Sequence, residues 1–188
     1  MLRLLLLSKL PRTLSEHREK MADNRDSARK GKAIEHLVAA TCILASDLKL
    51  NVSTNLVDDE GVDLIFHRRE DTTTLAVQVK GRLLTANTIE KRNRFRQNVR
   101  AATFRARPGL AVLFVAVNAR DGTFPLAWLI PSKEFRREFA APNNQGRYVF
   151  AASMKDDSQD RWRKYRCERA ELAGLILTAL DTLSGSRK

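Results

Sequence analysis

The order of apolar patterns along the chain predicts a single α/β (α+β-like) domain with a mixed central sheet flanked by helices. A helical periodicity precedes three β-rich segments, and a second helical segment precedes two apolar strands and a closing helix. The length of 188 residues and the apolar fraction of 43% suffice to bury a core. We expect residues 26–188 to form this domain and residues 1–25 to be a poorly ordered extension, with Met21 an alternative start.

Residues 26–48 carry apolar side chains at spacings of three and four, which predicts a helix with Glu35 at the edge of its apolar face. Polar breaks then separate short β-rich segments, and this alternation indicates an antiparallel meander. We expect these strands over residues 50–57, 62–68 and 73–83.

The second half of the chain is expected to contain two strands between helices. Residues 90–107 have helical character and end at Pro108-Gly109, while 110–117 is a continuous apolar run typical of a strand covered on both faces. That run is too short to cross a bilayer, so no membrane association is expected. The remaining expectations are a strand at 126–130, a short helix capped by Ser132, an edge strand at 148–151, a polar exposed segment at 156–169 and an amphipathic helix at 168–183.

Three polar side chains are expected to meet on the hairpin formed by 62–68 and 73–83. A symmetric turn places Asp63 opposite Gln78, and directly opposed residues have β-carbons about 4.5–5.5 Å apart on one face. Lys80 lies two residues beyond Gln78, so its side chain leaves from the same face. The spacing therefore gathers a carboxylate, an amide oxygen and an ammonium group.

This combination suits phosphodiester hydrolysis, which needs an activated water and relief of the charge that builds on phosphoryl oxygens. Mg²⁺ does both and prefers a few oxygen ligands together with water; Mn²⁺ is expected to substitute. Asp63 would be the charged ligand and Gln78 the neutral one, with Glu35 a second acid acting directly or through water. Lys80 would orient or deprotonate the attacking water and stabilise developing negative charge.

Two segments carry a family resemblance: Gly61-Val62-Asp63-Leu64-Ile65-Phe66, and Val77-Gln78-Val79-Lys80-Gly81, preceded by the helix that bears Glu35. Over residues 26–130 the chain resembles the core of the PD-(D/E)XK nuclease superfamily. The resemblance implies a restriction-endonuclease-like fold, metal binding at positions 63 and 78, a water-directed Lys80 and a Glu35 that completes the acidic cluster. It also implies a DNA endonuclease that leaves 5′-phosphates, and cutting of two strands would favour a homodimer.

Position 78 departs from that family, whose consensus there is Asp or Glu. The Gln-x-Lys form is similar to Mrr-type restriction nucleases, so activity is compatible with it. Loss of one negative charge should weaken metal binding.

The charge of the chain predicts a nucleic-acid partner. Its 34 Lys and Arg against 22 Asp and Glu give a formal charge of +12, which attracts polyanions. Gln97 is a further candidate for the site, and Trp162 and Tyr165 in a second basic patch at 161–169 could stack on bases or be partly buried. Side chains expected to contact phosphates without reading sequence are Arg82, Lys91, Arg92, Arg94, Arg96 and Arg100.

The same residues allow several alternatives. The hairpin triplet could be a solvated face with a surface ion pair, and residues 58–60 could be either a turn or a different metal cluster. The domain could be a non-catalytic nucleic-acid-binding module with a decayed nuclease fold, or an RNA-associated basic protein without a metal site. Cys42 and Cys167 lie far apart without disulfide or zinc spacing, which indicates buried thiols in a reducing compartment, the cytoplasm.

Overall fold

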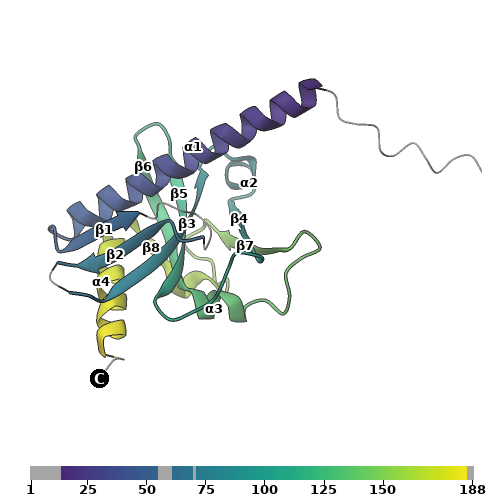
Figure 1. Ribbon diagram of the computed structural model, residues 1–188. Coiled ribbons are helices and arrows are strands. Elements are labelled where there is room, and N and C mark those ends of the chain that lie inside the picture. The colour runs from purple at the N-terminus through teal and green to yellow at the C-terminus, as the bar shows by residue number, and fades with distance from the viewer. Residues whose placement is uncertain (1–13, 55–60, 70, 186–188) are drawn as a thin grey trace, which may run out of the picture.

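The computed structural model describes residues 14–54, 61–69 and 71–185 (Figure 1). Its helices are α1 (Leu14–Ala45), α2 (Asn87–Glu90), α3 (Ser132–Arg137) and α4 (Arg169–Gly185), with a 3-10 turn at Arg163–Tyr165. Its strands are β1 (Leu50–Thr54), β2 (Leu64–Arg68), β3 (Thr74–Leu83), β4 (Arg94–Arg100), β5 (Leu110–Asn118), β6 (Thr123–Pro131), β7 (Arg147–Ser153) and β8 (Arg166–Glu168).

The central sheet is mixed, as the sequence predicts, with strand order β1-β2-β3-β5-β6-β8. Strands β3 and β5 run parallel, and the other neighbours in this sheet are antiparallel. A parallel pair needs a crossover, and here the crossover contains α2 and β4. Strand β4 pairs with β7 in a separate two-stranded ribbon.

Two apolar cores lie on opposite faces of the sheet. Helices α1 and α4 cover one face, where Val77 and Val79 of β3 are buried, and the β4–β7 ribbon and α3 cover the other (Figure 1). The second core is aromatic, with the rings of Phe114 and Phe150 stacked at 3.8 Å. Because side chains alternate along a strand, Gln78 and Lys80 leave β3 on the ribbon face.

Helix α1 begins at Leu14 rather than at the expected residue 26, and its N-terminal turns extend past the sheet (Figure 1). The sequence predicts a poorly ordered extension over residues 1–25. Residues 1–13 of that segment lie outside the described residues. Among the helices of the described segments, none has the length and apolarity needed to cross a bilayer.

The helix predicted over 90–107 is wrong, because most of that segment is strand β4. Phe95 and Val99 are fully buried, while the arginines beside them in β4 are exposed. That period-two pattern is what a half-buried strand requires. Pairing of Phe95 with Ala152 and of Val99 with Tyr148 then gives the strand its hydrogen-bonding partner.

The polar segment expected at 156–169 is also partly buried. Trp162 is 1% exposed and packs against Phe135 and Phe150, and Cys167 lies in β8 at the edge of the central sheet. The side chain of Ser132 does not cap α3; its hydroxyl bonds the backbone of Arg107 instead. The closing helix and the doubly covered strand β5 are confirmed.

Candidate active site

The hairpin register predicted from sequence is confirmed within β2, since Leu64 pairs with Val77 and Ile65 with Ala76, but it does not extend to the expected pairing of Asp63 with Gln78. Asp63 immediately precedes β2, and its N–H donates to the Val77 carbonyl at 3.0 Å. Its Oδ2 accepts a hydrogen bond from the Val79 N–H at 2.6 Å. The Asp63 carboxylate is therefore held against the β3 backbone at Val79.

Gln78 is buried with an orphaned oxygen. The residue is only 5% exposed. Within the described part of the chain, its side-chain Oε1 has no hydrogen-bond partner. Its Nε2 lies beside Gly61, where an added β-carbon would approach to 2.5 Å. Gly61 has φ +66°, a conformation that favours glycine. The glycine before Val62 thus provides both the turn and the space for the Gln78 amide.

Lys80 lies at the border between two hollows. The first, here called the Asp63 hollow, has a volume of about 560 Å³ and is lined by Glu35, Asp63 and Lys80. The second, the Gln78 hollow, has a volume of about 370 Å³ and is lined by Gln78 and again by Lys80. Lys80 is half-buried and makes no ion pair with any described residue. The predicted residues are thus brought together around Lys80, with Asp63 and Gln78 on different sides of it.

Glu35 reaches the Asp63 hollow because α1 packs closely on β3. A β-carbon at Gly81 would come within 2.4 Å of Ile34 Cδ1, so the absence of a side chain at this position makes room for Ile34. Glu35 follows Ile34 in the helix and is 8% exposed, and its Oε2 accepts from Lys32 Nζ at 2.7 Å. The helix-edge glutamate is therefore a buried carboxylate at the rim of the site.

Gln97 also lines both hollows, as the sequence suggested, although it does so from a strand and not from a helix. Its Nε2 donates to the Gly81 carbonyl at 2.8 Å, which ties β4 to the end of β3. This hydrogen bond holds the β4–β7 ribbon next to the end of β3 that carries Lys80.

The basic residues predicted to bind phosphates are all exposed. Arg82 lines the Asp63 hollow, and Arg100 lines the Gln78 hollow. Arg147 was not identified from the sequence; it lies in β7 and lines the Gln78 hollow. Asn98 of β4 and Thr103 line the same hollow. No local signal marks Arg147, because only the β4–β7 pairing brings it to the site. The other exposed members are Lys91, Arg92, Arg94 and Arg96.

No known protein-family model and no curated protein matches this chain. A function is accordingly inferred from the residues of these two hollows.

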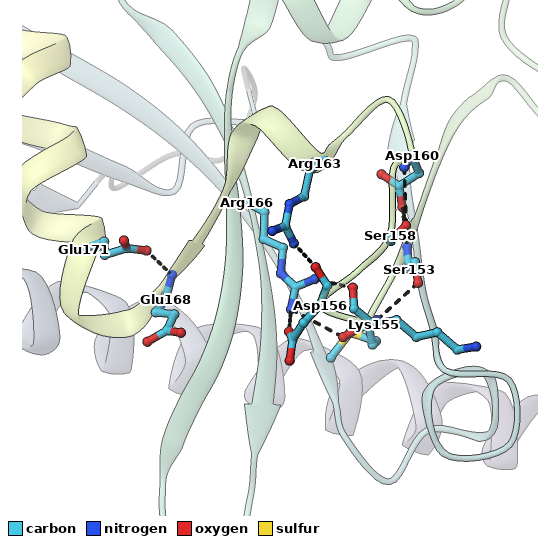
Figure 2. A network of polar contacts seen from close by, with 10 residues as sticks. Ser153, Lys155, Asp156, Ser158, Asp160, Arg163, Arg166, Glu168 and Glu171 are labelled. Carbon is cyan, nitrogen blue, oxygen red and sulfur yellow. Dashed lines mark hydrogen bonds and ion pairs between the residues drawn. The ribbon is translucent and has the colours of Figure 1, made fainter.

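Most cations of the second basic patch make contacts within the protein. Figure 2 shows Arg163 and Arg166 directed at Asp156, with Arg166 paired to its carboxylate and Arg163 bonded to its carbonyl. A hollow of about 600 Å³ lies beside this network, but its arginines already have partners. Burial of Trp162 excludes its ring from stacking on bases, so the burial alternative is confirmed for that residue.

The oxygen donors that line the two hollows are of the type that a hard divalent ion prefers. They are the carboxylates of Glu35 and Asp63 and the unpartnered amide oxygen of Gln78, and oxygen donors are those that Mg²⁺ prefers. Across the described segments, no group of at least three His, Cys, Asp or Glu is arranged to hold an ion. An ion bound here would keep several waters, which is usual for Mg²⁺. The alternative cluster at 58–60 lies outside the described residues.

Proposed function

We propose that this protein is a Mg²⁺-dependent phosphodiester hydrolase that acts on nucleic acid, with DNA as the expected substrate and a restriction-endonuclease-like fold. The observation that carries the proposal is Gln78 Oε1, a buried carbonyl oxygen without a partner among the described residues, in a hollow bordered by Lys80. Leaving such an acceptor unsatisfied costs about 1–3 kcal/mol. An ion or its bound water would satisfy it.

The proposed role of each residue follows from its environment. Asp63 and Gln78 would hold the ion and Glu35 would contact it through water. Bound there, the ion would lower the pKa of a water molecule and offset charge on the phosphoryl oxygens. Lys80 has no internal ion pair within the described chain, so its protons are available to the attacking water or to a phosphoryl oxygen.

The distribution of charge supports a polyanionic substrate. Arg100 lines the Gln78 hollow, and Arg94 and Arg96 are exposed on the same strand; none of the three makes an ion pair with a described residue. By contrast, Arg161 and Arg166 are paired with Glu138 and Asp156. Unpaired cations beside the site are those that phosphates would neutralise, with release of counterions.

A cleavage assay tests the proposal. Duplex, branched and single-stranded DNA and RNA are incubated with Mg²⁺, Mn²⁺ or a chelator, using wild type, Asp63→Asn and Lys80→Met. Lys49→Met, at an exposed lysine beside β1, is the matched control. We expect metal-dependent cleavage, loss of metal binding in Asp63→Asn, and a rate at least about 100-fold lower in Lys80→Met.

Two results would overturn the proposal. Cleavage by Lys80→Met at the wild-type rate would remove the proposed mechanism. Binding of nucleic acid by the wild type without cleavage under every condition would instead identify a non-catalytic binding module.

A further inference from the structure

Two arginines face each other across the β4–β7 ribbon. Arg100 and Arg147 are directly opposed in the register, and both are exposed. Directly opposed residues of an antiparallel pair have β-carbons about 4.5–5.5 Å apart, and like charges there are destabilising. The ribbon therefore carries an unfavourable pair that its own residues do nothing to relieve.

Within the described chain, no acid compensates these two charges. Strands β4 and β7 contain neither Asp nor Glu. The guanidinium groups of Arg100 and Arg147 make no hydrogen bond or ion pair with any described residue. Elsewhere the same chain pairs its arginines, as at Arg137 with Glu134 and at Arg166 with Asp156. Arg100 and Arg147 lack such a partner although they lie directly opposite each other.

Both arginines line the Gln78 hollow, whose other walls supply neutral donors and one more cation. Asn98 and Thr103 contribute an amide and a hydroxyl, Lys80 contributes an ammonium group, and no carboxylate of a described residue lines the hollow. Its volume of about 370 Å³ exceeds the roughly 30 Å³ share of one water molecule many times over, so it has room for a tetrahedral oxyanion.

We infer that the Gln78 hollow is a subsite for one phosphate group, held jointly by Arg100 and Arg147. Guanidinium groups present planar forks of N–H donors that match phosphate oxygens, and two of them on opposite sides of one phosphate convert mutual repulsion into shared attraction. The inference rests on the proposed function in one respect: Lys80 borders both hollows, so the bound phosphate would neighbour the one that is cleaved. The group could be an internal phosphodiester or a terminal phosphate of a nucleic-acid strand.

Joint binding of a single phosphate makes a specific prediction for a double-mutant cycle. Affinity for a short single-stranded DNA is measured in chelator across a range of salt for wild type, Arg100→Gln, Arg147→Gln and the double variant. Each single change should lower affinity about 10- to 100-fold. The double variant should lose much less than the product of the single effects, because the single changes remove the same contact. Its log–log salt slope should fall by about 0.7, the value for one phosphate.

The matched control is Arg94→Gln, which removes an exposed arginine from the same strand at a position opposite Ser153 and outside the hollow. The fold-losses of affinity caused by Arg94→Gln and by Arg100→Gln should multiply when the two changes are combined. Independent effects of Arg100→Gln and Arg147→Gln, with a doubled change of slope, would overturn the joint subsite.

The source of the phosphate is assigned by comparing 5′-phosphorylated with 5′-hydroxyl oligonucleotides. A preference for the phosphorylated strand that Arg147→Gln abolishes identifies a terminal phosphate. Equal binding of the two strands, with both still weakened by Arg147→Gln, identifies an internal phosphodiester.

A stability measurement tests the same inference without nucleic acid. Arg147→Gln should raise the melting temperature in phosphate-free buffer of low ionic strength, because it removes repulsion from Arg100. Inorganic phosphate should raise the melting temperature of wild type but not of the double variant. Equal stabilisation of both by phosphate would overturn the subsite. Since none of these measurements involves cleavage, an inactive enzyme would leave this inference standing, and a failed subsite would leave the cleavage test unaffected.

Discussion

Replacement of Gly61 by alanine should disturb the site through a single methyl group. The residue has φ +66°, and a left-handed backbone costs a residue with a β-carbon about 1–2 kcal/mol. The new methyl would also lie 2.5 Å from Gln78 Nε2, so the amide must leave its position. Forcing a side chain off its rotamer adds about 0.5–1.5 kcal/mol. Gly61→Ala should therefore lose about 1.5–3.5 kcal/mol in the free energy of unfolding.

Gly122→Ala separates the two costs. Gly122 has φ +65°, and a β-carbon added there would have no neighbouring atom within 4 Å, so alanine meets only the backbone cost. In a domain of this size 1 kcal/mol corresponds to about 2–4 °C in melting temperature. Thermal unfolding should place Gly61→Ala about 1–6 °C below Gly122→Ala.

Metal binding provides the functional readout for the same pair. Calorimetric titration with Mn²⁺ should show weaker binding to Gly61→Ala and wild-type binding to Gly122→Ala, because only the first change displaces the Gln78 oxygen. Equal melting temperatures and equal Mn²⁺ affinities for the two variants would refute the placement of Gln78 as a ligand.

Three further experiments have defined outcomes. Gln78→Glu should tighten Mn²⁺ binding, measured by calorimetry, and weaken oligonucleotide binding in the presence of chelator. Unchanged affinities for Mn²⁺ and for the oligonucleotide would show that Gln78 contacts neither of them. Gly81→Ala should push Ile34 and helix α1 away from β3, lowering stability and turnover, and Ile34→Ala in the same chain should restore part of both. Burial raises the pKa of the Cys42 and Cys167 thiols to about 12, so only about 1 in 10⁴ is thiolate at pH 8. Both should react with Ellman's reagent only after unfolding, and fast labelling of the native protein would contradict this.

The hairpin of the candidate site can be predicted from sequence because its residues are close together along the chain. Alternating apolar residues on either side of a turn determine which residues of the hairpin oppose each other, and the register from Leu64 to His67 follows. The sequence does not reveal that Asp63 bonds the Val79 N–H, since that depends on how the chain enters β2. The packing of Gly61 against Gln78 is equally invisible, although the glycine itself could have signalled a turn with positive φ.

The helix predicted for the basic segment is wrong because neither propensity nor pattern decides the structure there. Arginine is a good helix former, and several arginines within residues 92–107 favour a helix when counted alone. Phe95 and Val99 also fit the alternation of a strand, with Gln97 between them on the same face, although their spacing of four suits a helix equally well. The structure follows the alternation because β7, which lies far along the chain, supplies the partner strand and the apolar surface. Tertiary contacts decide such cases, and Arg147 was missed for the same reason.

The neutral residue at position 78 has a physical rationale in this arrangement. The two carboxylates of the site, Glu35 and Asp63, line one hollow, while Arg100 and Arg147 line the other together with Gln78. A carboxylate at position 78 would share that second hollow with the arginines and would compete with a phosphate for their N–H donors. It would also add a charged oxygen for the metal. Under the proposed function, glutamine would supply a metal-ligating oxygen without neutralising the cations, so it would weaken metal binding but keep the proposed phosphate subsite open.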